Sequence, residues 1–307
     1  MYFKDMEQRT LTTWFMATRP QFFTVIILPI ILGTAIANYS QGVFLPQYFV
    51  LSLLAGILVH AGINVLNDYY DHLNKTDEFN HSPLSPFAGG SRMIQKGILS
   101  SMETYRYGIM LLIIAVGIGL FLVWARGLLL LWIGLFGVLS GYSYSAPPFS
   151  LVSRGLGEIL VGLNFGILAV LGAYYVQAQS VGLIAVIAAL PLAALVTAIL
   201  YINEFPDYTA DKMAGKNTLV VRLGKENARL IYVFLIGFSF VAIILGVIYH
   251  KLPQFSLASL LAIPLGFFAI KTLYAHYDKP TALIPAIKNT IMLHTLLSIL
   301  LILAFVF

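Results

Sequence analysis

Two segments with the pattern N-[DE]-[YF]-x-D interrupt an otherwise apolar chain. They are Asn67-Asp68-Tyr69-Tyr70-Asp71 and Asn203-Glu204-Phe205-Pro206-Asp207. Residues three or four positions apart share a face of a helix, so Asp68 and Asp71 are expected on one side. The same applies to Asp207 and Asp211, although Pro206 is expected to distort or end that helix. Grouped carboxylates repel unless a cation lies between them, and oxygen ligands in a chain without cysteine favour Mg²⁺ with a bound phosphate.

Acidic residues in a membrane protein can also have two roles that are not enzymatic. They could form salt bridges with basic residues at a membrane surface, or they could bind a coupling ion in a transporter. Seven of the 13 acidic residues gather near the two motifs, namely Asp68, Asp71, Asp77, Glu78, Glu204, Asp207 and Asp211. Because they fall at helix ends and in loops rather than in the middle of broken helices, a metal-dependent enzyme is the favoured interpretation. The salt bridges and the transporter remain the alternatives.

Glycine and basic residues follow each motif. Residues 85–97 contain Gly89 and Gly90, which permit close backbone approach, together with Arg92. Residues 211–224 contain Lys216. Basic residues in such loops also mark the cytoplasmic side of a membrane protein. Beside carboxylates, Arg92 and Lys216 are predicted to bind phosphate groups.

Aromatic residues near the motifs suit a reaction through an allylic cation. Breaking an allylic C–O bond leaves a cation that needs electron-rich surroundings, and tyrosine rings can supply them. Tyr70, Tyr142 and Tyr144 are the candidates, although an aromatic belt at a membrane interface would account for the same residues. A histidine could deprotonate a phenolic acceptor, but none has metal-ligand spacing to another histidine. The histidines near the first motif are His60, His72 and His81.

The motif residues must be positioned by the long apolar segments of the chain. The chain has 307 residues, of which 59% are hydrophobic and only 10% charged, as in a polytopic membrane protein. Nine runs of about twenty residues predict transmembrane helices. They are residues 21–39, 47–67, 106–124, 127–145, 156–177, 181–203, 228–249, 256–275 and 288–307. We expect an all-α fold in which residues 1–307 form a single transmembrane domain in the lipid bilayer. No nucleic-acid-binding motif is present.

Nine helices place the two termini on opposite sides of the membrane, and the basic residues indicate which side is which. Of the 18 lysines and arginines, only Arg126 and Lys251 fall between predicted helices on one side. By the positive-inside rule the other side, which holds the N-terminus, is cytoplasmic. Residues 1–19 mix charged and apolar residues and are expected to form a cytoplasmic amphipathic segment. The motif loops, roughly 68–105 and 204–227, lie on this side of the cell (inner) membrane.

These motifs resemble the UbiA-type membrane prenyltransferases. The matching segments are Arg19-Pro20 with Leu28-Pro29, Asn64 through Asp77, Gly141 through Pro148, Arg154 through Glu158, and the second motif continued through Gly215-Lys216-Asn217-Thr218-Leu219. They extend over most of the chain, and the paired Asp motifs are the most specific part.

The resemblance implies a nine-helix bundle with a cytoplasm-facing central cavity and an opening to lipid for a polyprenyl tail. It further implies that two Mg²⁺ ions bind a polyprenyl diphosphate. Matched residue by residue, Asn64, Asp68 and Asp71 would serve the first ion. Asp207 and Asp211 would serve the second, and these four aspartates would be the catalytic residues.

The same match suggests roles for further residues. Arg154 corresponds to a basic position that holds the diphosphate. Many relatives carry another Asp where this chain has Lys75, and Asp77 is the expected substitute ligand. Asn203 is assigned to the second ion. The remaining diphosphate-binding assignments are Arg19, Asn64, Asn67, Arg92, Lys212 and Lys216.

The loop after the first motif suggests the acceptor. Relatives that prenylate 4-hydroxybenzoate tend to carry an Arg-Pro pair there, whereas this loop reads Ala88-Gly89-Gly90-Ser91-Arg92. The glycine pair resembles the branch that prenylates 1,4-dihydroxy-2-naphthoate in menaquinone biosynthesis. The expected acceptor is therefore an aromatic quinone precursor, with the naphthoate first and 4-hydroxybenzoate or a related precursor as the alternative. The sequence leaves the prenyl chain length and the oligomeric state open.

Overall fold

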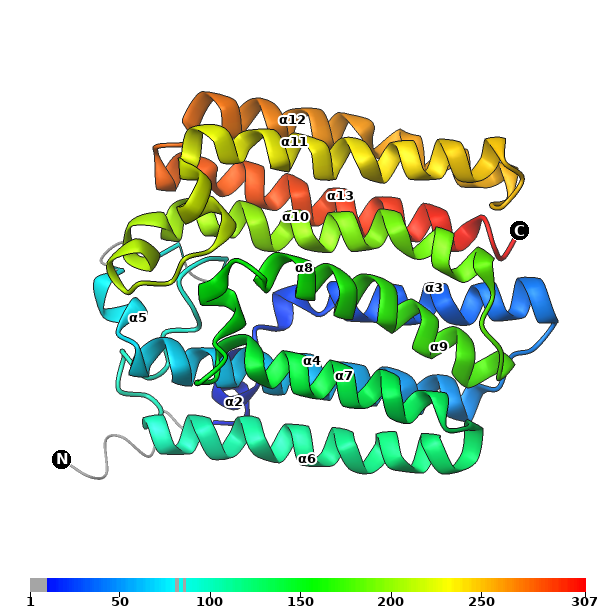
Figure 1. Cartoon of the computed structure of the whole chain (residues 1–307), viewed down its shortest axis with the longest axis horizontal. Helices are drawn as coiled ribbons and strands as arrows, with labels where there is room; N and C mark the ends of the chain where they lie inside the picture. The colour runs from blue at the N-terminus through cyan, green and yellow to red at the C-terminus, as the bar shows by residue number, and fades with distance from the viewer. Residues whose placement is uncertain (1–9, 81–82, 85–86) are drawn as a thin grey trace.

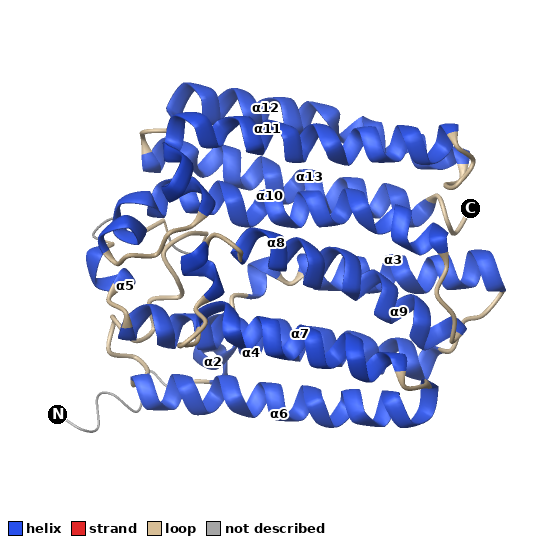
Figure 2. Ribbon diagram, viewed as in Figure 1, coloured by secondary structure: helices blue, strands red, loops and turns tan. Residues whose placement is uncertain are grey.

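The computed structural model describes residues 10–80, 83–84 and 87–307, and within these ranges every regular element is a helix (Figures 1 and 2). The α-helices are α2 (Leu11–Ala17), α3 (Thr24–Gln41), α4 (Pro46–Leu73), α5 (Thr76–Phe79), α6 (Ser101–Arg126), α7 (Leu129–Ser145), α8 (Gly157–Val161), α9 (Ala169–Ala178), α10 (Leu183–Met213), α11 (Leu219–Ile248), α12 (Ile263–His276) and α13 (Ile284–Leu303). The 3₁₀ and π segments are η1 (Pro20–Phe22), η2 (Leu151–Arg154), η3 (Gly162–Leu168), η4 (Gln254–Ala262) and η5 (Pro280–Leu283). The predicted all-α fold is confirmed.

Sequence signals explain where several helices begin. Ser100 caps α6 in a capping box, because its side chain accepts a hydrogen bond from the backbone N–H of Glu103 and Glu103 reaches back to Ser100. Thr10 and Thr218 cap α2 and α11 by accepting from backbone N–H groups three positions later. These caps fix the starts of helices that flank the two motifs.

Nine apolar helical segments are found within the described residues. Eight are long and apolar enough to cross a membrane, namely Pro20–Gln41, Pro46–Leu73, Ser101–Arg126, Gly157–Ala178, Leu183–Met213, Leu219–Ile248, Gln254–His276 and Pro280–Leu303. The ninth, α7, is apolar but has only 17 residues. They follow the nine predicted spans in number and order.

The helices extend beyond the apolar runs where the motifs lie. α4 continues to Leu73 and α10 to Met213, so both motifs are helical and the predicted motif loops begin too early. Hydrophobicity marks only the part of a helix inside the bilayer, and polar final turns lie beyond it. Pro206 does not end its helix, because α10 continues through that residue.

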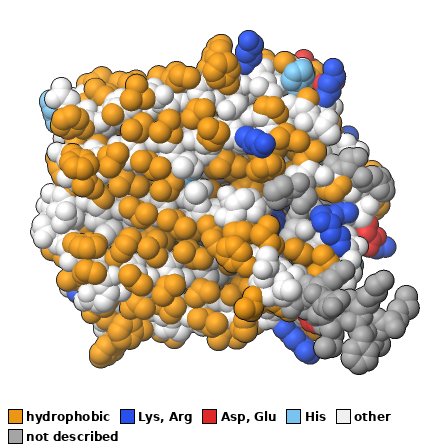
Figure 3. Space-filling view, turned by 180° about the vertical axis from the view of Figure 1, so that it is seen from behind, with side chains coloured by type: hydrophobic (Ala, Val, Ile, Leu, Met, Phe, Trp, Pro, Cys, Tyr) orange, Lys and Arg blue, Asp and Glu red, His pale blue; other side chains and the backbone are white. Residues whose placement is uncertain are grey.

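The long helices run side by side, so the two motifs meet at one end of the bundle. In Figure 1 this end is at the left, where α4 and α10 finish near α5, and the C-terminus lies at the opposite end. On the face that Figure 3 shows, hydrophobic side chains cover most of the surface and charged side chains gather toward one end. A bundle that spans a bilayer needs this distribution.

The core is built around α10. Its fully buried side chains include Leu192, Leu195, Tyr201, Ile202 and Phe205. Small residues bring neighbouring helices into close contact, as at Gly33, where an added Cβ would lie 2.2 Å from the carbonyl oxygen of Val170. The burial of its own side chains fixes α10 and therefore the direction of its motif side chains.

Candidate active site

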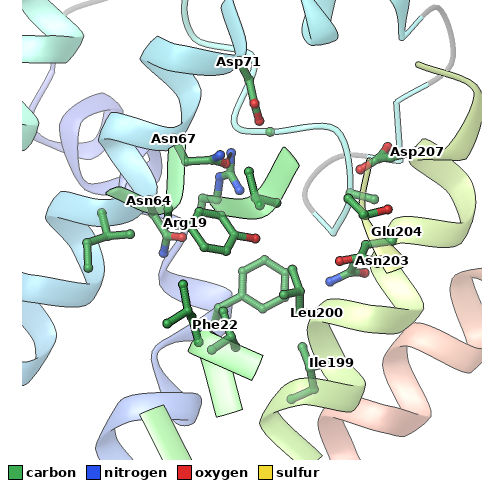
Figure 4. A pocket seen from close by; sticks show the side chains of 18 of the residues that line it. Arg19, Phe22, Asn64, Asn67, Asp71, Ile199, Leu200, Asn203, Glu204 and Asp207 are labelled. Carbon is green, nitrogen blue, oxygen red and sulfur yellow. Dashed lines mark hydrogen bonds between the residues drawn. The ribbon is translucent and has the colours of Figure 1, made fainter. Parts of the chain in front are cut away.

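A cavity lies between the motif-bearing ends of α4 and α10 (Figure 4). It contains about 1260 Å³ free of protein atoms, part of it open to solvent. Its polar mouth includes Arg19, Asn64, Asn67, Asp71, Asp77, Asn80, Asn203, Glu204, Asp207, Asp211 and Lys216. Its mainly apolar deeper part includes Phe22, Val25, Ile63, Leu160, Val161, Phe165, Val196, Ile199 and Leu200. The cavity suits a ligand with an anionic head and an apolar body.

One side of α4 supplies a row of polar residues to the cavity. They are His60, Asn64, Asn67 and Asp71. Their spacing of four, three and four positions keeps them on one face of the helix. Asp68 is also buried and lies next to this row. The first motif is thus brought together as its helical spacing predicted.

The second motif faces this row from α10. Figure 4 shows Asn203, Glu204 and Asp207 on the opposite wall from the α4 residues. Asp211 follows one helical turn later, lines the cavity and is buried. Two groups of acidic residues that are far apart in the sequence therefore line the same cavity.

Lys216 connects the two acid groups. Its Nζ lies 3.2 Å from each carboxylate oxygen of Asp71 and 3.8 Å from Oδ1 of Asp211. Burial lowers the pKa of Lys216, but the negative charges of Asp71 and Asp211 outweigh burial and raise this pKa above its ordinary value. Lys216 is therefore a stable cation at the mouth of the cavity.

Arg19 supplies a second cation. It forms a salt bridge with Asp68, and its guanidinium donates a hydrogen bond of 3.3 Å to Oδ1 of Asn67. Arg19 lies between α2 and η1 with a left-handed backbone (φ 56°), which turns the chain there. Burial lowers its pKa, but the charge and hydrogen bond of Asp68 together with the charges of Asp71 and Asp77 outweigh burial, and the pKa is raised.

The loop that follows α5 covers the acids with hydrogen-bond donors. The Gly89 N–H donates to Oδ2 of Asp207 over 3.1 Å, and the Asn80 side chain donates to Oδ1 over 2.8 Å. Gly90 has a φ of 77°, and an added Cβ would lie 3.0 Å from Oδ1 of Asp68. The glycine pair therefore lets the backbone approach the two carboxylates closely.

Asp77 lies on α5 and adds a carboxylate to the first motif's side of the cavity. Gln95 donates to its Oδ2 over 2.9 Å, and Arg92 lies 3.7 Å from its Oδ1. Burial, followed by the nearby charges of Asp71 and Asp68, raises the pKa of Asp77 to about 7. Arg92 thus contacts an acid of the site without lining the cavity itself.

The oxygen atoms of the mouth fit a divalent cation. Within the described ranges, no three His, Asp or Glu side chains are close enough to hold one ion. Lys216 and Arg19 pair with Asp71 and Asp68 instead. However, Oδ1 of Asn203 and Oδ1 of Asp211 are buried and have no hydrogen-bond partner among the residues that the structure describes. Carboxylate and amide oxygens are the donors that Mg²⁺ prefers, so the donor chemistry fits this ion together with a bound phosphate.

Six predicted site residues do not line the cavity. Asp68 and Arg92 pair with residues that do line it, and the other four are Arg154, Lys212, Tyr70 and Tyr142. Arg154 is exposed and donates to a backbone carbonyl over 2.8 Å, and Lys212 is also exposed. The hydroxyls of Tyr70 and Tyr142 are 2.9 Å apart in a separate cluster between α4 and α7. Of the three predicted tyrosines, Tyr144 lines the cavity.

The cavity also contains residues that the sequence analysis missed. Phe165 supplies an aromatic face, but nothing distinguishes it within its apolar run. Asn164 is an isolated polar residue inside the predicted span 156–177, and that isolation is a usable signal. Among the candidate histidines, His60 lines the cavity, His72 does not, and His81 lies outside the described residues.

Comparison with known proteins identifies the family. The model of the UbiA prenyltransferase family matches residues 26–305, which is most of the chain. The chain belongs to this family. It is therefore a prenyltransferase, and its apolar helices make it an integral membrane protein.

Two curated relatives of this UbiA family member are named for a naphthoate and for a carboxynaphthoquinone. The chain is 31% identical to the 1,4-dihydroxy-2-naphthoate octaprenyltransferase of Escherichia coli (strain K12), over 91% of this chain and 90% of the relative. It is 26% identical to the 2-carboxy-1,4-naphthoquinone phytyltransferase of Synechocystis, over 87% of this chain and 84% of the relative.

A solved structure confirms the UbiA fold. A UbiA homolog from Archaeoglobus fulgidus, bound to GPP and Mg²⁺, superposes with a TM-score of 0.66 over 96% of this chain and 99% of that one. The two sequences are 18% identical, so the likeness concerns the fold alone.

Proposed function

We propose that this protein transfers a polyprenyl group from a polyprenyl diphosphate to 1,4-dihydroxy-2-naphthoate, in a Mg²⁺-dependent reaction of menaquinone biosynthesis. The observation that carries the proposal is the cavity, in which two acid groups and two half-buried cations surround a polar mouth above an apolar interior. The named activities of the curated relatives support the acceptor. The GPP and Mg²⁺ bound by the Archaeoglobus homolog support the donor and the ion.

In the proposed reaction the allylic C–O bond breaks and its electron pair leaves with the diphosphate. The ring carbon that bears the carboxylate then bonds to the allylic carbon. Loss of the carboxylate as CO₂ returns an electron pair to the ring and restores its aromaticity. Lys216 and Arg19 stabilise the charge that develops on the diphosphate. Phe22, Tyr144 and Phe165 line the cavity, where they exclude water and offer π faces to the cation.

Mg²⁺ would supply Lewis-acid stabilisation of the leaving diphosphate. Its proposed ligands are Asn64, Asp68, Asp71 and Asp77 on one side and Asn203, Asp207 and Asp211 on the other. Two ions, one for each motif, are proposed. We also propose that residues 1–307 act as one transmembrane domain.

The proposal predicts Mg²⁺-dependent release of diphosphate. Purified protein with a long-chain prenyl diphosphate and the naphthoate should release diphosphate when Mg²⁺ is present, and about a hundredfold more slowly when it is chelated. A coupled phosphate assay with added pyrophosphatase measures the release. An unchanged rate after chelation would contradict the metal requirement, and no release under any condition would contradict the activity.

The proposed orientation places the N-terminus and the cavity mouth in the cytoplasm at the cell (inner) membrane. The chain has no cysteine, so a single engineered cysteine gives an unambiguous label. In intact cells a membrane-impermeant maleimide should label Lys251→Cys but not Lys96→Cys, and both positions are exposed. Both should react in inverted or permeabilised membranes to similar extents. Labelling of Lys96→Cys from outside would reverse the orientation.

A further inference from the structure

Polar side chains from three helical segments also line the cavity among its deeper apolar residues. They are His60 of α4, Ser140 of α7 and Asn164 of η3. Asn164 donates to the Ser140 hydroxyl over 2.8 Å, and its own Oδ1 is buried without a hydrogen-bond partner among the described residues. The imidazole of His60 is 5% exposed, and neither of its nitrogens has such a partner. Buried polar atoms are normally hydrogen-bonded, so these atoms are suited to a ligand.

The surrounding packing holds the two side chains in place. The imidazole of His60 lies edge-on to the rings of Phe23 and Phe165, with centroids 5.9 Å and 5.0 Å away. Asn164 lies in the π-helical segment η3, which packs tightly on α10. An added Cβ at Gly166 would come within 2.2 Å of the Cα of Ala193. Since π-helical turns often occur at functional sites, this irregular segment strengthens the case for a ligand.

A polyprenyl tail does not explain these polar atoms, because it has no group that can form a hydrogen bond with them. The diphosphate does not explain them either, since the cations that suit it are Arg19 and Lys216 at the mouth. His60 precedes Asp68 by eight residues on α4, which corresponds to about 12 Å along the helix. If an aromatic ring is held between the diphosphate and the deeper part of the cavity, its far edge would reach the level of His60.

We infer that His60 and Asn164 form a subsite for a hydroxyl group on the far edge of the acceptor ring. This inference rests on the proposed function and deepens it. In 1,4-dihydroxy-2-naphthoate the 4-hydroxyl is farther from the carboxylate-bearing carbon than the 1-hydroxyl is. With that carbon facing the allylic carbon, the 4-hydroxyl donates to Oδ1 of Asn164 or exchanges a hydrogen bond with His60. The two residues therefore select dihydroxylated over monohydroxylated rings.

The test compares the binding of two acids that differ by this hydroxyl. The full-length protein is loaded with Mg²⁺ and an unreactive thio analogue of the prenyl diphosphate. The Kd values of 1,4-dihydroxy-2-naphthoate and 1-hydroxy-2-naphthoate are then measured anaerobically by calorimetry. We expect the wild type to bind the dihydroxy acid about tenfold more tightly, the effect of one well-placed hydrogen bond. In Asn164→Leu and in His60→Leu this preference should fall to about twofold, with the affinity for the thio analogue unchanged.

Two further variants separate recognition from packing. His60→Gln keeps a hydrogen-bonding group and should retain most of the preference. Ser298→Ala removes a buried hydroxyl on α13 that also has no hydrogen-bond partner among the described residues, and it does not line the cavity, so the preference should stay tenfold. A tenfold preference retained in both leucine variants overturns the subsite. If the subsite is overturned but the wild type forms prenylated naphthoate, the proposed function still holds. If the wild type forms no such product, the subsite and the proposed function are both wrong.

Discussion

Replacing Asp71 or Asp211 by asparagine is expected to lower kcat by about a thousandfold. Both carboxylates are buried at the mouth of the cavity, and both lie near Lys216. Asparagine keeps the size of the side chain but removes the charge that would bind a divalent cation and orient the lysine. We expect Asp68→Asn and Asp207→Asn to have similar effects, measured as product formed per minute by purified protein.

Folding must be separated from catalysis in this series. Each variant should elute as the wild type does in gel filtration and keep its melting temperature within a few degrees. Asp278→Asn is the matched control, because Asp278 is exposed and does not line the cavity. Its turnover should equal that of the wild type. Turnover at the wild-type rate in any two of the four motif variants would contradict the proposal that both motifs act on one metal-bound diphosphate.

Replacing Lys216 by methionine is expected to lower kcat by about a hundredfold, the size of effect seen when a charge-stabilising donor is lost. The change removes the cation between Asp71 and Asp211 and leaves both carboxylates without their charge partner. Lys216→Arg, which restores the charge, should recover part of the rate. Steady-state assays with the donor varied will give kcat and KM for each variant.

Lys225→Met is the comparison for this experiment. Lys225 lies at the same end of the bundle but packs 5.2 Å from the ring centroid of Tyr208 and does not line the cavity. The loss of one positive charge from this end of the protein is therefore common to both variants. If Lys225→Met and Lys216→Met reduce kcat equally, the reduction is caused by the loss of net charge and not by the loss of the Lys216 contacts in the cavity.

Helical periodicity predicts the polar wall of the cavity on α4 and also explains why one predicted residue, Tyr70, lies outside the cavity. His60, Asn64, Asn67 and Asp71 share one face, as their spacing requires. Consecutive residues on a helix are about 100° apart, so Tyr70 is turned away from the face that carries Asp71. Its assignment to the cavity relied on closeness in sequence, which does not preserve direction on a helix.

Contacts between distant segments could not be read from local patterns. Asp71 and Lys216 belong to different helical hairpins, and only the packing of α4 near α10 brings them together. The Arg19 contact with Asp68 depends on a left-handed residue between two short helices, which has no clear sequence signal in a residue other than glycine. The sequence therefore anticipated the two acid groups and the cations Arg19 and Lys216, but not which acid each cation pairs with.

The mass of the reaction product shows directly whether this protein prenylates 1,4-dihydroxy-2-naphthoate. Purified protein is supplied with Mg²⁺ and a long-chain prenyl diphosphate. Parallel reactions contain either 1,4-dihydroxy-2-naphthoate or 4-hydroxybenzoate. The masses of the extracted products are then measured by mass spectrometry. We expect a prenylated naphthalene diol that has lost the mass of CO₂, and no prenylated 4-hydroxybenzoate. A product from 4-hydroxybenzoate with none from the naphthoate would contradict the proposed acceptor while leaving the prenyltransferase intact.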